Sequence, residues 1–273
     1  MILYPNAKIN IGLNVIEKRE DGFHNLETLF YPVGVVGNAK DGEVSSHPVD
    51  VLEIVESDEL QMHQYGIEYP GDPMDNLCVR AYNALHRDFD IPPVAIHLYK
   101  KIPVGAGLGG GSSDAAFTLK GLNEMFSLGL SDERLAEYAA TLGSDCAFFI
   151  YNRPMIGTGR GEILEPAEIF PLDDYQIRLV FPPYFVSTAA AYGGIVPRNK
   201  RVANGEKFDS RQLLQMLRNP VDTWKGCVVN DFETTVFAKI PELAPYKDEL
   251  YAQGAVYASM SGSGSAFFGI FKK

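Results

Sequence analysis

A glycine-rich segment, from Pro103 to Ala116, contains the residue types best suited to binding a phosphate. Five glycines fall within seven residues, which excludes a strand or a stable helix, since each glycine costs about 1 kcal/mol relative to alanine inside a helix. Two serines, an aspartate and two alanines follow and indicate the capped start of a helix. Backbone N–H groups converge at such a junction, and the helix dipole favours negative charge there. The segment therefore predicts an anion site with phosphate as its guest.

Common glycine patterns do not explain this loop. A P-loop NTPase needs a lysine followed by serine or threonine after the last glycine, whereas Gly111 is followed directly by Ser112. The dinucleotide pattern G-x-G-x-x-G is met between Gly105 and Gly110, but a glycine-dense run meets such patterns by chance. Glu124, at the distance of the required acidic residue, lies in a helical pattern. A flexible linker is also disfavoured, because a strand precedes the loop and a periodic helix follows it.

Two charged residues elsewhere are candidates for chemistry on a hydroxyl group. Lys8 and Asn10 share one face of an alternating segment, 7–15, opposite its apolar side chains. Asp145 follows a predicted helix end and precedes an apolar run, 147–150, that indicates a strand. From the pattern alone, a solvated lysine and an aspartate that caps its own turn remain the simpler interpretations.

Three further features show no chemistry of their own. The turn that contains Phe23 and His24 predicts a hairpin with a surface histidine. Thr188 and Tyr192 lie in a segment of small residues, where core packing explains the tyrosine as well as a binding role does. The glycine–serine run 261–265 predicts a hairpin between two apolar strands.

Hydrophobic periodicity predicts the elements that position these residues. The expected strands cover 7–15, with all its apolar side chains on one face, 29–36, 51–55, 94–99, 176–181, 256–260 and 266–271. The expected helices cover 75–88, 115–126, 132–142, a stretch capped by Asp209 or Ser210 that ends at Leu217, 231–238 and 243–252.

Strands and helices alternate without a regular βαβ rhythm, so an α+β fold in two lobes is expected rather than a doubly wound sheet. The segment 152–165 is rich in glycine and proline. We therefore expect an N-terminal lobe over residues 1–155 and a C-terminal lobe over residues 156–273.

Composition narrows the class of protein. The 273 residues have a formal charge of −11 and show no basic stripe, so a nucleic acid partner is not expected, and phosphate binding must rest on local N–H groups, a few lysines and a metal ion. No apolar stretch reaches the roughly 18 residues of a membrane span, and the N-terminus lacks a basic and apolar leader. Three scattered cysteines fit the reducing cytoplasm. The five histidines show no paired ligand spacing, so no structural zinc is expected.

The motif Pro-x-x-x-Gly-Leu-Gly, from Pro103 to Gly109, with the following Ser-Ser-x-Ala-Ala, resembles the ATP loop of the GHMP kinases. With the two additional glycines, Gly110 and Gly111, the loop resembles that of the family member that phosphorylates a cytidine-diphosphate-linked sugar alcohol in the non-mevalonate isoprenoid pathway. The resemblance implies a two-lobed α+β kinase that uses ATP and Mg²⁺ on a small-molecule alcohol, as a monomer or homodimer. Another GHMP kinase, acting on homoserine, mevalonate or a sugar, and a non-catalytic nucleotide-binding relative are the alternatives.

The resemblance also implies roles for the loop residues. Those expected to bind ATP are Pro103, Val104, Gly105, Ala106, Gly107, Leu108, Gly109, Gly110, Gly111, Ser112 and Ser113. The two serines are compatible with helix capping and with phosphate or Mg²⁺ contact, and no metal ligand is assigned. The hairpin 261–265 is expected to bring its backbone close to this loop.

The remaining roles concern catalysis and the substrate. By resemblance, Lys8 neutralises charge near the transferred phosphoryl group, and Asp145 is the general base that takes a proton from the acceptor hydroxyl. Asn10 is expected to position the substrate.

The cytosine is expected to be bound by two segments. By resemblance, His24 hydrogen-bonds the base and Phe23 stacks on it, although relatives often have tyrosine at this position. Tyr192 is the candidate second stacking face and Thr188 a polar contact.

Overall fold

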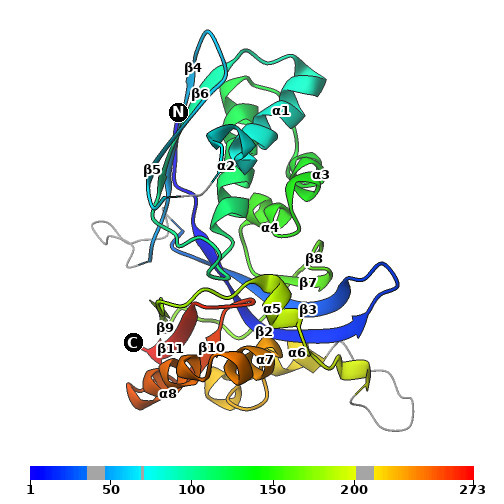
Figure 1. Ribbon diagram of the computed structural model, residues 1–273, viewed down its shortest axis with the longest axis vertical. Helices are drawn as coiled ribbons and strands as arrows, with labels where there is room; N and C mark the ends of the chain where they lie inside the picture. Colours follow the sequence, from blue (N-terminus) through cyan, green and yellow to red (C-terminus); the bar gives the residue numbers. More distant parts are fainter. Residues whose placement is uncertain (36–46, 69–70, 201–211) are drawn as a thin grey trace. The chain divides into compact units, whose positions relative to one another are not determined.

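The computed structural model describes residues 1–35, 47–68, 71–200 and 212–273 (Figure 1). The chain forms two compact units. The first comprises residues 1–8, 32–104 and 109–153, and the second comprises residues 9–31, 105–108 and 154–273. The helices and mixed sheets of these units confirm the predicted α+β class.

The first unit contains a four-stranded sheet whose helices lie along one side (Figure 1). The strand order is β1-β4-β6-β5, and only β5 runs parallel to its neighbour β6. The strands are β1 (Ile2–Leu3), β4 (Val51–Glu56), β5 (Gln61–Gly66) and β6 (Val94–Lys100). The helices are η1 (Pro73–Asp75), α1 (Leu77–Phe89), α2 (Gly110–Met125), α3 (Asp132–Leu142) and α4 (Cys146–Tyr151).

Helix α2 carries the end of the glycine-rich loop and packs closely on the sheet. A Cβ added at Gly121 would lie 2.6 Å from Leu3 Cδ1 and 3.0 Å from Ile54 Cδ1, so only glycine permits this approach. The helix predicted over 115–126 is confirmed, although it begins earlier, at Gly110, and its residues Ala115, Leu119 and Leu122 are fully buried. The loop end of α2 is therefore fixed by the core of the first unit.

The second unit contains two antiparallel sheets, with strand orders β2-β3-β7-β8 and β10-β11-β9. The strands are β2 (Ala7–Lys18), β3 (His24–Val33), β7 (Met155–Gly159), β8 (Ile163–Pro166), β9 (Tyr175–Val180), β10 (Tyr257–Met260) and β11 (Phe267–Lys272). The helices are α5 (Thr188–Tyr192), η2 (Arg198–Lys200), α6 (Gln212–Leu217), η4 (Val221–Thr223), α7 (Phe232–Lys239), η5 (Pro241–Leu243) and α8 (Ala244–Ala252). The predicted cap of α6 at Asp209 or Ser210 lies outside the described residues.

Strand β2 does not alternate regularly, which corrects the single apolar face predicted for it. Gly12 has a φ of +72°, the left-handed conformation that marks a β-bulge. Before it, Asn10 Nδ2 donates to Thr28 Oγ1 (3.0 Å), and after it Asn14 Nδ2 donates to Glu27 Oε2 (2.8 Å). Glu27 and Thr28 are adjacent in β3, and adjacent residues of a strand point to opposite faces. Their partners Asn14 and Asn10 therefore also lie on opposite faces. The bulge moves the apolar side chains that follow Gly12 to the other face.

The apolar run 147–150 is a helix and not the strand that we predicted. It lies within α4, and the five residues from Cys146 to Ile150 are all buried. A short apolar run buried on all sides carries no periodicity that separates a strand from a helix. The segment 152–165, predicted only as a boundary, contains β7 and the start of β8.

Candidate active site

In the first unit, the glycine-rich loop ends in a helix terminus with no side-chain cap. Gly109 is the N-cap residue of α2, with a φ of +70°, and no side chain caps the helix. The first N–H groups of α2 are therefore available to an anion. The two predicted serines differ, because Ser112 is half-buried whereas Ser113 is fully buried and its hydroxyl has no hydrogen-bond partner among the described residues.

Lys8 and Asp145 meet beside this loop. Lys8, at the start of β2, places Nζ 3.3 Å from Asp145 Oδ2. A Cβ on Gly109 would lie 3.2 Å from Lys8 Cε and 3.0 Å from the Phe149 ring. The fold thus places the predicted lysine, the predicted carboxylate and a glycine of the phosphate loop side by side.

The simpler interpretations of these two residues do not hold. The Lys8 side chain is only 4% exposed, so it is not a solvated surface lysine. Asp145 makes no capping hydrogen bond at the start of α4, and its carboxylate is 32% exposed. The pair therefore consists of a buried ammonium group, on Lys8, and a partly exposed carboxylate, on Asp145, that a ligand can reach.

In the second unit, Asn10 belongs to a buried polar chain. Its Nδ2 donates to Thr28 Oγ1, which donates in turn to the Gly12 carbonyl (2.6 Å). Its backbone N–H donates to Ser261 Oγ (3.3 Å), and this hydroxyl donates to the Gly107 carbonyl (2.9 Å). Thr28 and Ser261 were not among the predicted side-chain contacts, since a threonine in a strand and a serine in a hairpin carry no distinctive signal.

The predicted approach of the 261–265 hairpin to the phosphate loop is confirmed. Gly107 has a φ of +79°, and a Cβ there would lie 2.1 Å from the Ser261 carbonyl oxygen. A Cβ on Gly262 would lie 3.2 Å from the Gly107 carbonyl oxygen. The two glycine segments are in backbone contact, which only residues without side chains allow.

In the second unit, two of the side chains predicted to bind a base, His24 and Tyr192, lie in ring contact, whereas Phe23 lies against Arg160. His24 stacks on Tyr192, with ring centroids 4.7 Å apart and planes at 22°. Burial, with a smaller contribution from Lys18, lowers the pKa of His24 and favours its neutral form. Phe23 is 54% exposed, and the Arg160 guanidinium lies 5.1 Å from its ring centroid.

Thr188 lies nearby along the same segment as Tyr192. It begins α5, and its hydroxyl oxygen is 3.4 Å from that of Ser263 in the glycine hairpin. Its neighbour Ser187 caps the helix by accepting the Ala190 N–H (3.1 Å). Thr188 is therefore left with its hydroxyl toward the hairpin and not engaged in the cap.

A buried charge cluster at the base of the phosphate loop was not predicted. Lys100 Nζ donates to Asp50 Oδ2 and to Asp114 Oδ2 (2.8 Å). Asp50 Oδ1 accepts the backbone N–H groups of Lys101 and Ile102, where the chain enters the loop. Asp114 is the fifth residue of α2, just after the chain leaves the loop. The cluster therefore joins the two ends of the loop.

The sequence did contain a signal for this cluster. Val94, Ile96 and Leu98 of β6 point to the core, and Lys100 continues the same two-residue spacing. A lysine in phase with a buried face requires buried carboxylates to compensate its charge. Their identity could not be predicted, because Asp50 and Asp114 come from distant parts of the chain.

The charge balance of the cluster predicts a pH dependence of stability. Burial, together with the charge of Asp50, raises the pKa of Asp114 to about 8 despite Lys100. One lysine is then balanced by one carboxylate, and Asp114 keeps its proton. Between the ordinary carboxyl range and this raised pKa, unfolding releases that proton, so stability falls as pH rises, with a limiting slope of about 1.4 kcal/mol per pH unit.

Replacing Asp114 with asparagine is expected to remove this contribution. Unfolding midpoints in urea, measured from pH 5 to pH 8, should decline less steeply with pH for Asp114→Asn than for the wild-type protein. Asp248→Asn, at an exposed aspartate of α8, is the matched control and should keep the wild-type slope. Parallel curves for all three proteins would contradict a protonated Asp114.

Within the described residues, no helix has the length and apolar character needed to cross a membrane.

Comparison with known proteins covers nearly the whole chain. The GHMP kinases N terminal domain matches residues 76–153, and the GHMP kinases C terminal domain matches residues 211–273. A Bacteroides fragilis protein named 4-diphosphocytidyl-2-C-methyl-D-erythritol kinase is 50% identical, over 99% of this chain and 92% of that protein. A crystal structure of 4-(cytidine 5'-diphospho)-2C-methyl-D-erythritol kinase has a TM-score of 0.73 and 32% identity, and the match covers 98% of this chain and 89% of that one.

A homoserine kinase from Cytophaga hutchinsonii has a similar structure, with a TM-score of 0.67 over 98% of this chain and 85% of that one. Its sequence is only 16% identical, so this similarity concerns the fold alone.

Proposed function

Because the chain belongs to the GHMP kinase family, we propose that it transfers the γ-phosphoryl group of ATP to the 2-hydroxyl group of 4-diphosphocytidyl-2-C-methyl-D-erythritol. This reaction is a step of the non-mevalonate pathway to isoprenoid precursors. The substrate follows from relatives of that name, which match 99% and 98% of the chain. The observation that supports phosphoryl transfer most directly is the Lys8–Asp145 pair beside Gly109.

Phosphoryl transfer passes through a loose transition state, so catalysis consists mainly of positioning and charge neutralisation. The residues from Pro103 to Ser113 would hold the phosphates through backbone N–H groups and the uncapped terminus of α2. Lys8 would neutralise charge on the transferred group. Its burial supports this role, since a desolvated cation acts more strongly than one in water.

Asp145 would accept the proton of the 2-hydroxyl as the phosphoryl group arrives. The ion pair with Lys8 (3.3 Å) supports this role, because it holds the partly exposed carboxylate of Asp145 beside the phosphate loop. Asn10 would help to position the alcohol, with its amide fixed by Thr28.

Mg²⁺ is the metal ion implied by the family, and it usually binds through one or two protein oxygens together with the substrate phosphates. Ser112 fits this requirement, because its hydroxyl lies in the first turn of α2 and is not fully buried. When bound, the ion would neutralise phosphate charge. Ser113 is fully buried and suits a structural position better.

The cytosine would be held by the aromatic residues of the second unit. Tyr192 would provide one stacking face and Phe23 the other, and neutral His24 would hydrogen-bond the base. In the structure His24 stacks on Tyr192, so a base that stacks on the same face of Tyr192 would take the place of the imidazole. Thr188 would add a polar contact.

Replacing Tyr192 with alanine is expected to raise KM for the cytidyl substrate about 5- to 150-fold, the equivalent of the roughly 1–3 kcal/mol that base stacking contributes. KM for ATP should stay unchanged. Steady-state kinetics with each substrate varied in turn measures both constants. Tyr192→Phe retains the ring and is the matched control. Equal changes in both KM values would indicate damage to the core around Phe232, on which Tyr192 also packs.

We also propose that the enzyme is cytoplasmic and acts on small molecules, as a monomer or homodimer. The three cysteines support this compartment, because all of them are free thiols and two are buried. The charge of −11 supports small-molecule ligands over nucleic acid.

The direct test is ADP release from ATP and Mg²⁺ in the presence of the cytidyl substrate, homoserine, mevalonate or galactose. Turnover with the cytidyl substrate alone is expected. Turnover with one of the other alcohols would overturn the substrate assignment, and ATP binding without turnover would favour a non-catalytic nucleotide-binding protein.

A further inference from the structure

We propose that Asn230 is a positioning residue for ATP, acting through the hairpin 261–265 on Gly107 of the phosphate loop. The inference rests on the proposed function, because it requires that this loop binds the ATP phosphates. Asn230 lies two residues before α7 and is only 2% exposed. A side chain so deeply buried does not reach a ligand directly, so its effect on ATP would be transmitted by the backbone groups that it binds.

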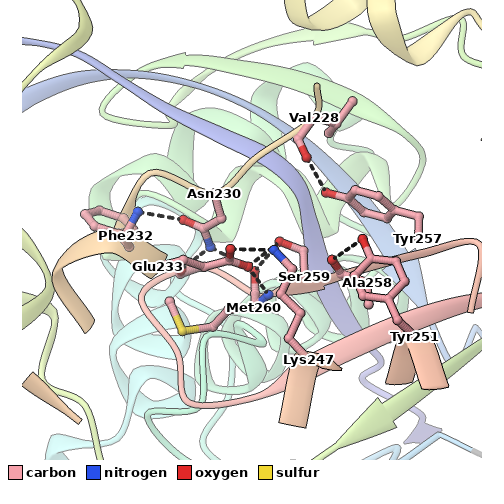
Figure 2. Close-up of polar contacts among 11 residues, drawn as sticks. Val228, Asn230, Phe232, Glu233, Lys247, Tyr251, Tyr257, Ala258, Ser259 and Met260 are labelled. Atoms are coloured by element: carbon pink, nitrogen blue, oxygen red, sulfur yellow. Dashed lines mark hydrogen bonds and ion pairs between the residues drawn. The ribbon is translucent and has the colours of Figure 1, made fainter. Parts of the chain in front are cut away.

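Strand β10 ends at Met260, directly before the hairpin, and lies at the edge of its sheet. Side chains bind its outer backbone groups (Figure 2). Glu233 Oε1 accepts the Met260 N–H (2.9 Å) and the Ser259 hydroxyl (3.0 Å). Asn230 Nδ2 donates to the Met260 carbonyl (2.8 Å). The last residue of β10 is thus held by both its N–H and its C=O group.

Asn230 also binds the hairpin itself. Its Nδ2 also donates to the Gly262 carbonyl (2.8 Å), and its Oδ1 accepts the Phe232 N–H (3.0 Å). An amide nitrogen has two hydrogens, and both are used on carbonyls that flank the start of the hairpin. No other residue type of this size supplies two donors and an acceptor.

The backbone at Asn230 is fixed in turn by β2. The Leu13 N–H donates to the Val229 carbonyl (2.9 Å), and the Asp231 N–H donates to the Leu13 carbonyl (2.8 Å). Leu13 directly follows the bulge at Gly12. Asn230 therefore links β2, an edge strand of its sheet, to a hairpin made of glycine and serine.

Hydrogen bonds connect the hairpin and the residue after it to the phosphate loop. Ser261 Oγ donates to the Gly107 carbonyl (2.9 Å), and the Ala266 N–H donates to the Ala106 carbonyl (3.2 Å). Gly262 lies close enough to Gly107 that an added Cβ would be 3.2 Å from its carbonyl oxygen. A shift of Gly262 would therefore displace Gly107, whose neighbouring N–H groups are those expected to face phosphate.

Glu233 and Tyr251 also bind β10, but their role is limited to holding the strand. Glu233 binds β10 and the Lys247 ammonium (2.6 Å), and the Tyr251 hydroxyl donates to the Ala258 carbonyl (3.3 Å). Both bind the strand (Figure 2), and within the described part of the chain neither forms a hydrogen bond to residues 261–265. Among the described residues, the side chain that joins the strand end to Gly262 is that of Asn230.

The test compares Asn230→Asp with Tyr251→Phe in the full-length protein. Aspartate keeps the shape but presents a carboxylate to the two carbonyls. We expect KM for ATP to rise roughly 10- to 100-fold, the equivalent of two lost hydrogen bonds, and the ATP-induced rise in Tm to shrink. KM for the cytidyl substrate should stay within about twofold. Tyr251→Phe should leave both KM values unchanged.

Ser261→Ala provides a second variant if Asn230→Asp does not fold. It removes the hydrogen bond from the hairpin to Gly107 and is expected to raise KM for ATP in the same direction. Where both variants fold, combining them should raise KM for ATP less than the product of the single effects, because both act on one contact.

A destabilised Asn230→Asp protein with unchanged KM for ATP and an unchanged ATP-induced shift in Tm would overturn the inference, and so would an unchanged KM in Ser261→Ala. A wild-type protein that does not phosphorylate the cytidyl substrate would overturn the proposed function instead. The ATP-induced shift would then still test the effect of the hairpin.

Discussion

Asp145→Asn is expected to lower kcat about 10²- to 10⁴-fold, the range that a positioned general base contributes. Asparagine has nearly the same shape but cannot accept the proton of the substrate hydroxyl. The change also leaves Lys8 without the carboxylate that lies 3.3 Å from its ammonium group. KM for ATP should change little, since Asp145 is the residue before α4 and does not belong to the phosphate loop.

The measurement is steady-state ADP release with both substrates saturating, combined with urea unfolding to verify the fold. Asp248→Asn, at an exposed aspartate of α8, is the control and should keep wild-type kcat. A near-wild-type kcat in Asp145→Asn would remove the base from the mechanism. Lys8 and the loop would then carry the catalysis by charge neutralisation alone.

Lys100→Met is expected to reduce the free energy of unfolding by about 3–5 kcal/mol, the cost of breaking a buried ion pair by removing one partner. Lys100 is 5% exposed and its two partners are almost completely buried. Without the ammonium group, the carboxyl groups of Asp50 and Asp114 face each other in a low-dielectric core. Chemical unfolding monitored by circular dichroism measures the loss.

The adjacent residue supplies the control for this variant. Lys101 has an exposed side chain, so Lys101→Met should change stability by no more than about 0.5 kcal/mol. Adding Asp50→Asn to Lys100→Met should restore part of the stability, because it removes the carboxylate that Lys100 balances and keeps an oxygen for the Lys101 and Ile102 N–H groups. Similar losses for Lys100→Met and Lys101→Met would show that the cluster does not support the fold.

Local patterns predicted those parts of the fold that local physics determines. The helix at 132–142 has a serine cap and two acidic residues in its first turn, and its predicted bounds are those observed. The alternation of β2 was predicted correctly only as far as Gly12, because a bulge depends on how a partner strand is paired and not on the strand's own pattern.

In the candidate site, too, features of one continuous segment were predictable from sequence, whereas contacts between distant segments were not. The glycine loop was predictable, since its glycine content is a property of one continuous segment. The start of α2 was predicted wrongly, because the helix begins at Gly110 and not at Ala115, and no serine caps it. Lys8 and Asp145 were ambiguous from their own patterns, and only the family resemblance selected them. Their contact joins a strand and a helix terminus far apart in sequence.

Asn230 and Asp50 could not be predicted from sequence spacing at all. Each binds backbone groups of a distant segment, and an asparagine or aspartate between apolar elements looks like an ordinary turn residue. Their importance follows from what they bond to, which only the tertiary structure provides.

The side chains along β10 also bear on how the protein behaves at high concentration. An edge strand with free N–H and C=O groups is a template on which another chain can add a strand and begin to aggregate. At β10 the Met260 N–H and C=O groups and the Ala258 carbonyl are already bonded to Glu233, Asn230 and Tyr251. The neighbouring strand β11 is rich in phenylalanine, a composition that would favour such growth. The contacts that hold β10 therefore also keep this sheet from extending into a neighbouring molecule.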